Sequence, residues 1–192
     1  MIYVITGFPR SGTSMMMQAL QAGGMPISYS EARDRTVRGS RRDVWYDPNP
    51  TGLFEVEPPP TDDLEFPRQY EGYAIKVLWP GVLRMAQHDY RIALMHRDPE
   101  EIRQSLEAFN NRDLFGKFPY TAAKWLRLRD HLVTRADVRS LHTVDYADAV
   151  ENPQRTFELL RDAGWPLDSQ AAATIVNPTL YRFQLDRLTV GI

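Results

Sequence analysis

Cysteine is absent from this chain of 192 residues, and its absence excludes disulfides, thiolate metal sites and cysteine nucleophiles. A chain without cysteine fits a reducing compartment, so we expect a cytoplasmic protein. No apolar run approaches the ~18 residues of a membrane-spanning helix, and the opening MIYVITGF has no basic leader. The sequence therefore predicts a soluble protein.

A large excess of charge of either sign is also missing. The chain has 23 lysines and arginines against 25 acidic residues, which gives a net charge of −2. Such a balance provides no general attraction to nucleic acid or to an anionic membrane, so we expect neither partner. Any site for an anion must be local. The length and a hydrophobic content of 43% suit one domain over residues 1–192.

Short apolar runs alternate with helical patterns along the chain. Strands are expected at 2–6, 73–78, 91–96 and 140–145. Helices are expected from Thr13 or Ser14 to Gly23, from Pro99 with Asp98 as cap, near 119–134 and over 153–163. This alternation predicts an α/β protein with a central parallel sheet between two layers of helices.

The alternation of strand and helix patterns is lost between about residues 30 and 70, where proline is frequent. We expect a long ordered loop, a lid or substrate loop, because Trp45, Tyr46, Phe54 and Phe66 favour packing over disorder. Several arginines lie within 33–42. They form either a solvated loop or a basic cover over an anionic ligand.

The segment GFPRSGTS (7–14) follows the first expected strand and fits the phosphate-loop frame G-x-x-x-x-G-K-[ST], except that Thr13 replaces the lysine. A turn from a strand into a helix directs backbone N–H groups at one point, where the helix dipole adds positive charge. We therefore expect a P-loop-like oxyanion site with Arg10 as its cation. The alternative is a strand-turn-helix corner in which Ser or Thr only caps the helix.

The residues PRSGTS resemble the 5′-phosphosulfate loop P-[KR]-S-G-T-[ST] of sulfotransferases that use 3′-phosphoadenosine 5′-phosphosulfate (PAPS). With the segment 49–57 discussed below, the resemblance is to the bacterial type of this family. The resemblance implies PAPS as co-substrate and no metal. It also implies that Arg10 stabilises the departing phosphate. The surrounding donors would come from Ser11, Gly12, Thr13 and Ser14.

A second family signature is an arginine at the end of a strand with a serine eight residues later. HRDPEEIRQS offers Arg97 and Ser105 at that spacing, and the resemblance implies that both bind the 3′-phosphate of the donor. Arg97 would leave the carboxyl end of a parallel strand, where ligands bind in open α/β sheets. The alternatives are an arginine paired with Asp98 or Glu101 and a solvated serine.

The base of the reaction is harder to identify. Cytosolic members place a histidine within K-T-H-L-P, but KVLWP (76–80) has Leu78 at that position. NPTGLFEVE (49–57) resembles a segment of bacterial relatives and implies Glu55 as base, with Glu57 in reserve. Lys76, a costly residue within an apolar strand, is implied as a second cation on the sulfuryl group. Either glutamate is otherwise a solvated carboxylate, and Lys76 otherwise extends from the strand into solvent.

The expected activity is transfer of a sulfuryl group to an acceptor hydroxyl, on a carbohydrate or another small alcohol. Two alternatives stay open: a P-loop kinase of small molecules or nucleotides, and a nucleotide-binding module of the same fold without catalysis. VDYADAVENP also resembles the family in Tyr146, Asp148 and Pro153. The tail, in contrast, has only Arg182, Arg187 and Gly191 where many members have a basic loop over the donor.

Overall fold

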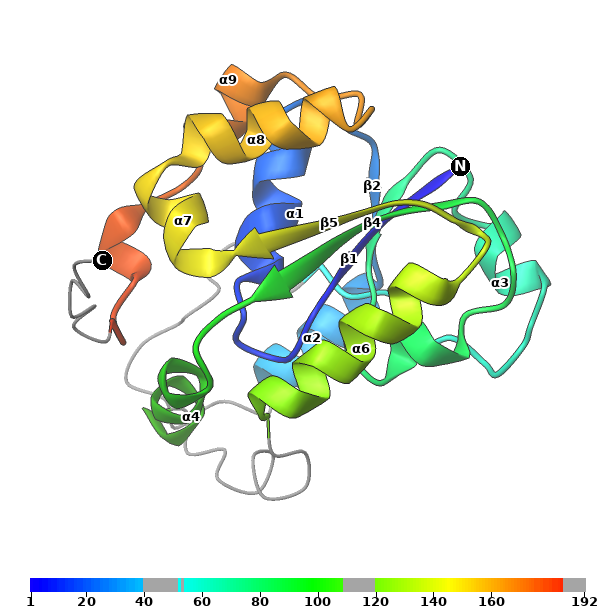
Figure 1. The fold of residues 1–192 in the computed structure, drawn as a ribbon, viewed down its shortest axis with the longest axis horizontal. Coiled ribbons are helices and arrows are strands. Elements are labelled where there is room, and N and C mark those ends of the chain that lie inside the picture. Colours follow the sequence, from blue (N-terminus) through cyan, green and yellow to red (C-terminus); the bar gives the residue numbers. More distant parts are fainter. Residues whose placement is uncertain (40–51, 53, 109–119, 185–192) are drawn as a thin grey trace.

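The computed structural model describes residues 1–39, 52, 54–108 and 120–184. Within these ranges five strands form one sheet in the order β2-β3-β1-β4-β5, and every neighbouring pair is parallel (Figure 1). The strands are β1 (Ile2–Thr6), β2 (Ile27–Ser28), β3 (Ala74–Lys76), β4 (Tyr90–His96) and β5 (Val138–Asp145). The predicted α/β fold with a central parallel sheet is confirmed.

Helices cover both faces of this sheet (Figure 1). The α-helices are α1 (Thr13–Ala22), α2 (Glu31–Gly39), α3 (Glu65–Arg68), α4 (Pro99–Ala108), α6 (Ala122–Thr134), α7 (Tyr146–Glu151), α8 (Pro153–Asp162) and α9 (Ser169–Ala173). Two short 3-10 helices, η1 (Gly81–Arg84) and η2 (Pro178–Leu180), complete the described elements. None of the helices in the described ranges is long and apolar enough to cross a membrane.

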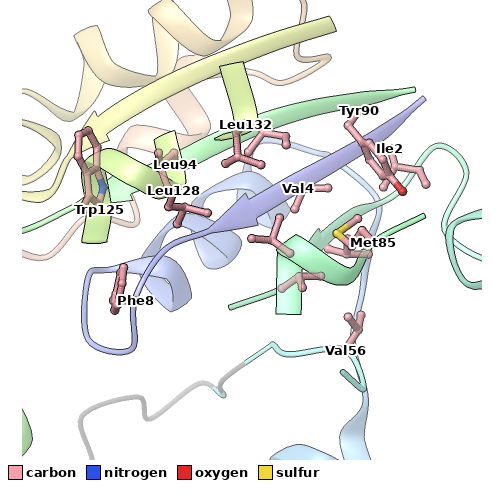
Figure 2. Packing of buried hydrophobic residues seen from close by; sticks show 14 of the residues in the cluster. Ile2, Val4, Phe8, Val56, Met85, Tyr90, Leu94, Trp125, Leu128 and Leu132 are labelled. Carbon is pink, nitrogen blue, oxygen red and sulfur yellow. The ribbon is translucent and has the colours of Figure 1, made fainter. Parts of the chain in front are cut away.

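The two faces of the sheet bury separate cores because successive side chains of a strand point to opposite sides. On one face Val4 and Leu94 pack with Leu128 and Leu132 of α6 (Figure 2). On the other face Ile5, Ala93 and Met95 join α1 and α8 in a second cluster. Both cores use the same central strands, so β1 and β4 are almost completely buried.

The four expected strands all form, with β3 shorter than expected. The four expected helices form as α1, α4, α6 and α8. Asp98 caps α4 as predicted, since its Oδ1 accepts a hydrogen bond from the Glu100 N–H at 2.7 Å. Residues 31–39 form a helix where we expected a loop, while residues 40–51 of the expected lid, with Trp45 and Tyr46, lie outside the described residues.

Because all five strands are parallel, their carboxyl ends meet at one edge of the sheet. The loop 7–12 leaves β1 there and leads into α1, Lys76 ends β3, and Arg97 follows β4. Ligands of open α/β sheets bind at this edge, and the residues named from the sequence lie along it.

Candidate active site

The loop of residues 7–12 turns sharply between β1 and α1. Its turn is closed by Ser11, whose N–H and hydroxyl both donate to the Phe8 carbonyl, at 3.2 and 2.7 Å. Arg10 and Gly12 both have left-handed backbone conformations, with φ of 72° and 96°. Helix α1 begins at Thr13 as predicted, and Gly12, its N-cap, has no side chain to cap it. The start of α1 can therefore offer backbone N–H groups to an oxyanion.

The ring of Tyr146 lies directly over Gly12. A Cβ atom added at Gly12 would come within 2.8 Å of Cε2 of that ring, closer than real Cβ contacts. Two features exclude a side chain at position 12: the left-handed backbone conformation, which favours glycine, and the Tyr146 ring, which leaves no room for a Cβ atom.

Four polar side chains meet beside the start of α1. The Lys76 ammonium donates to the Ser14 hydroxyl at 3.1 Å and lies 3.3 Å from Oε1 of Glu55. Arg33 binds the other carboxylate oxygen of Glu55 through Nε at 2.9 Å and Nη2 at 2.8 Å. The Lys76 side chain is 3% exposed and that of Glu55 is 12% exposed, so the charges are paired with little access to water.

This pairing determines the charge state of the carboxylate. Burial by itself would raise the pKa of Glu55, but the nearby Lys76 and Arg33 cations more than offset it, so the pKa lies below its ordinary value. Burial lowers the pKa of Lys76, and the Glu55 carboxylate opposes that effect. At neutral pH Glu55 is therefore an ionised carboxylate, able to accept a proton.

Glu55 is held in place by the first turn of α2. The Ser30 N–H donates to the Glu55 carbonyl at 2.8 Å, and Oδ2 of Asp34 accepts from the Phe54 N–H at 3.3 Å. Phe54 has a φ of 57°, an uncommon value for a residue with a side chain, and the Asp34 contact helps to hold it. On the other side, Glu55 forms a parallel bridge with Lys76.

Glu57 is placed differently from Glu55. Its carboxylate accepts from the Ser30 hydroxyl at 2.8 Å, and the contact is exposed. Of the two glutamates, Glu55 alone is paired with Lys76 among the described contacts. Of the two carboxylates, Glu55 is thus the buried one that is paired with cations, and Glu57 is the exposed one.

The structure brings Arg10, Arg97 and Ser105 together, as the spacing suggested. Nε of Arg10 donates to the Ser105 hydroxyl at 2.9 Å, and Nη1 of Arg97 donates to the Arg10 carbonyl at 3.1 Å. Arg97 is 5% exposed and Ser105 is completely buried. The alternative of a solvated serine is therefore wrong, whereas the binding role of these residues stays a prediction.

Arg97 has further partners that the functional reading of the sequence left out. Its Nε donates to Glu101 at 2.9 Å and its Nη2 to the Phe183 carbonyl at 3.3 Å. The guanidinium lies 4.4 Å from the ring centre of Tyr146 and 5.2 Å from that of Tyr181. The Tyr181 hydroxyl donates to Glu101 in turn. The sequence offered an ion pair of Arg97 with Asp98 or Glu101 as the alternative to a binding role, and the pair with Glu101 forms. The paired arginine is buried.

A pocket of about 170 Å³ opens beside Glu55 and Lys76. It lies between residue Pro9 of the loop, the segment 55–59 and the stretch 76–84 that continues from β3. The Trp79 N–H donates to the Gly7 carbonyl at 3.0 Å, which fixes this wall to the loop 7–12. Leu78, at the position of the family's histidine, is a pocket wall and supplies no base.

Histidine and acidic residues form no metal site in the described part of the chain, where no group of three such side chains is close enough to hold an ion. His96 lies at the same edge, with its Nδ1 2.9 Å from Oδ2 of Asp145 and its ring edge-on to Trp125. Its side chain thus contacts residues of β5 and α6.

No protein-family model matches the chain, and no curated protein matches it. Among solved structures, one of retinol dehydratase in complex with androsterone and inactive cofactor PAP is similar, with a TM-score of 0.49 and 13% sequence identity. The similarity covers 91% of this chain and 63% of that chain, so this chain spans less than two thirds of the length of the protein it matches.

Proposed function

We propose that this chain is a PAPS-dependent sulfotransferase that moves a sulfuryl group to the hydroxyl of a small alcohol. One observation carries the proposal: beside the loop 7–12, the Lys76 ammonium joins Ser14 to the carboxylate of Glu55, and Lys76 and Glu55 line a pocket. In this proposal Glu55 is the base, Lys76 is a cation, and the loop 7–12 binds the oxyanion. The pocket of about 170 Å³ receives the acceptor.

Glu55 would act as the general base. Its ionised carboxylate takes the proton of the acceptor hydroxyl while the acceptor oxygen forms a bond to sulfur. The bond between sulfur and the bridging oxygen of the donor breaks, and the electron pair stays on the departing phosphate. Lys76 and Arg10, with the N–H groups at the start of α1, stabilise the negative charge that grows there. The products are a sulfate ester, 3′-phosphoadenosine 5′-phosphate (PAP) and protonated Glu55.

Arg97 and Ser105 would bind the 3′-phosphate of the donor, and Ser11, Gly12, Thr13 and Ser14 would surround its 5′ end. The guanidinium of Arg97 donates to Glu101, to the Arg10 carbonyl and to the Phe183 carbonyl. Phosphate binding therefore requires an exchange of partners, and the Phe183 carbonyl, which lies farthest from the guanidinium at 3.3 Å, is the easiest of the three to release. The proposal predicts that residues near 181–184 move when PAP binds.

The first test is calorimetry with PAP and, separately, with ATP plus magnesium. We expect PAP to bind without metal and Arg10→Ala to weaken binding by at least about tenfold, because a charge-assisted hydrogen bond is lost. Arg139→Ala is the matched control, since Arg139 pairs with Asp89 on an exposed surface. Preference for ATP with magnesium would overturn the proposal in favour of a kinase.

The second test separates an enzyme from a binding module. Glu55→Gln keeps the size of the side chain and removes its basicity, so turnover should fall by about 10² or more while PAP still binds. Turnover that is indifferent to Glu55→Gln would show that the base lies elsewhere. PAP binding without turnover of any alcohol by the wild type would indicate a binding module.

A further inference from the structure

The pocket beside Glu55 has mainly apolar walls. Pro9, Pro59, Val77, Leu78 and Trp79 contribute to its lining. The Trp79 ring is itself fixed, stacked on the ring of Phe8 with 4.6 Å between centres. An apolar cavity of about 150 Å³ is known to hold benzene, so a pocket of about 170 Å³ accepts a body the size of one ring. The Trp79 side chain and the prolines of its lining offer apolar surface to such a ring.

The charges that line this pocket do not balance. They are the cations Arg33, Lys76 and Arg84 and the carboxylates Glu55 and Glu57. Within this set, Glu55 is bound by Arg33 and Lys76, and Glu57 accepts from the Ser30 hydroxyl.

With three cations against two carboxylates the lining has a net positive charge, and among the described contacts Arg84 is the cation that binds neither carboxylate. It is exposed at the end of η1, and none of the residues that the structure describes forms an ion pair with it. Its backbone is nevertheless fixed, because the Arg84 carbonyl accepts from the Asp62 N–H at 3.2 Å. A guanidinium in this position can donate two parallel hydrogen bonds to a planar anion.

We propose that the acceptor is a ring-sized alcohol with an anionic substituent, whose hydroxyl lies at Glu55 and whose anion is bound by Arg84. This inference rests on the proposed function for the role of Glu55, but the recognition of the anion depends on the pocket alone. The shared chemistry is a carboxylate or a similar oxyanion on a compact, mainly apolar ring. Uncharged alcohols of the same shape fit the walls and lack the contact with Arg84.

The probes are para-hydroxyphenylacetate and para-hydroxyphenylacetamide, which have nearly the same shape and differ in charge. Binding of each is measured by ligand-observed NMR with the PAP-loaded protein, and turnover of each is measured with PAPS. For the wild type we expect the acid to be favoured in both. Arg84→Ala should reduce the preference for the acid over the amide about tenfold, the effect of one charge-assisted contact.

Two further variants complete the test. Arg68→Ala is the matched control, because Arg68 is an exposed arginine paired with Glu65 on α3 and does not line the pocket; it should leave the preference unchanged. Arg84→Glu should reverse the preference, so that para-hydroxyphenethylamine binds better than the acid.

The outcomes distinguish this inference from the proposed function. If the acid binds in an Arg84-dependent way but is never sulfated, the pocket assignment holds and the proposed function fails. If sulfate transfer occurs but the acid and amide are treated alike, or Arg84→Ala leaves their ratio unchanged, the inference is overturned and the enzyme stands. Weak binding of both ring compounds beside efficient transfer to larger acceptors would also overturn it.

Discussion

The Lys76 ammonium lies 3.3 Å from the carboxylate of Glu55, and the two side chains are 3% and 12% exposed. The carboxylate also binds a second cation, Arg33, whereas the charge of Asp34 acts on Lys76 less strongly than that of Glu55 does. Loss of one partner of a buried pair is costly when it leaves a charge uncompensated. The two members of this pair should therefore differ in their effect on stability.

Glu55→Gln should lower the free energy of unfolding by about 3 kcal/mol, because the buried Lys76 ammonium loses the carboxylate with which it is paired. Lys76→Met should lower it by only about 1 kcal/mol, since Glu55 keeps Arg33 and the methionine replaces the apolar stem of the lysine. Urea unfolding monitored by circular dichroism measures both. Equal losses would mean that Arg33 does not compensate Glu55.

Acid should remove the contribution of Glu55 to stability. Its pKa in the folded protein lies below the ordinary value of 4.5, so the folded state binds this proton less readily than the unfolded state. The contribution is complete above pH 4.5 and is lost as the pH falls through the lowered pKa. Urea unfolding of the wild type and Glu55→Gln from neutral pH to about pH 3 should show the difference between them shrinking. A constant difference would contradict the pairing.

The sequence was sufficient for the parts of the site that depend on local geometry. A β-rich run, a glycine turn and a helix start predict the loop 7–12, and the spacing of Arg97 and Ser105 places both on one side of a strand-to-helix junction. Their meeting with Arg10 follows from the parallel pairing of β1 with β4. The alternating pattern predicted a parallel sheet, but not that these two strands are neighbours.

The residues that the sequence did not reveal act through tertiary contacts. Arg33 was one of several arginines in a polar stretch, and its role depends on the approach of α2 to residues 54–57. The sequence of that helix, EARDRTVRG, has few apolar residues, so hydrophobic periodicity could not predict it. It is joined to residues 54–55 by two hydrogen bonds, in which the Ser30 N–H donates to the Glu55 carbonyl and Asp34 accepts from the Phe54 N–H. The contact of Tyr181 with Arg97 likewise depends on tertiary structure, because it forms only where the segment after α9 packs against α4.

Gly12 should not tolerate a side chain. Gly12→Ala combines a left-handed φ of 96° with a collision against Tyr146, so it should cost about 3 kcal/mol and abolish PAP binding. Gly24→Ala is the matched control: its φ is 83°, and a Cβ there meets nothing within 4 Å, so its cost should be about 1 kcal/mol. Urea unfolding and calorimetry with PAP measure these effects.

The double variant Gly12→Ala with Tyr146→Ala checks the steric cause of that loss. Removal of the ring should make the alanine at position 12 less costly than it is in the presence of Tyr146, which a double-mutant cycle detects. If the costs of the two substitutions simply add, the collision with the ring is not the reason for the loss.

Arg33 and Arg35 offer the sharpest comparison in the molecule, because they lie on one helix and only Arg33 contacts Glu55. Arg35 pairs with Glu31, and both of those side chains are exposed. Arg33→Met should raise the pKa of Glu55, since a hydrogen bond and a cation that lower it are removed. Arg35→Met, with the same change of charge and side chain, should not. Carbon-13 NMR titration of the Glu55 carboxyl measures the shift directly.

The same pair of variants tests whether Glu55 is the base. A base must be deprotonated to act, so a higher pKa moves the acid limb of the pH dependence of kcat to higher pH in Arg33→Met and leaves it in place in Arg35→Met. A Glu55 pKa that rises in the NMR titration while the acid limb stays unchanged would separate the two roles of this carboxylate. Glu55 would then be a structural partner of Lys76, and the proton of the acceptor would have to leave by another group.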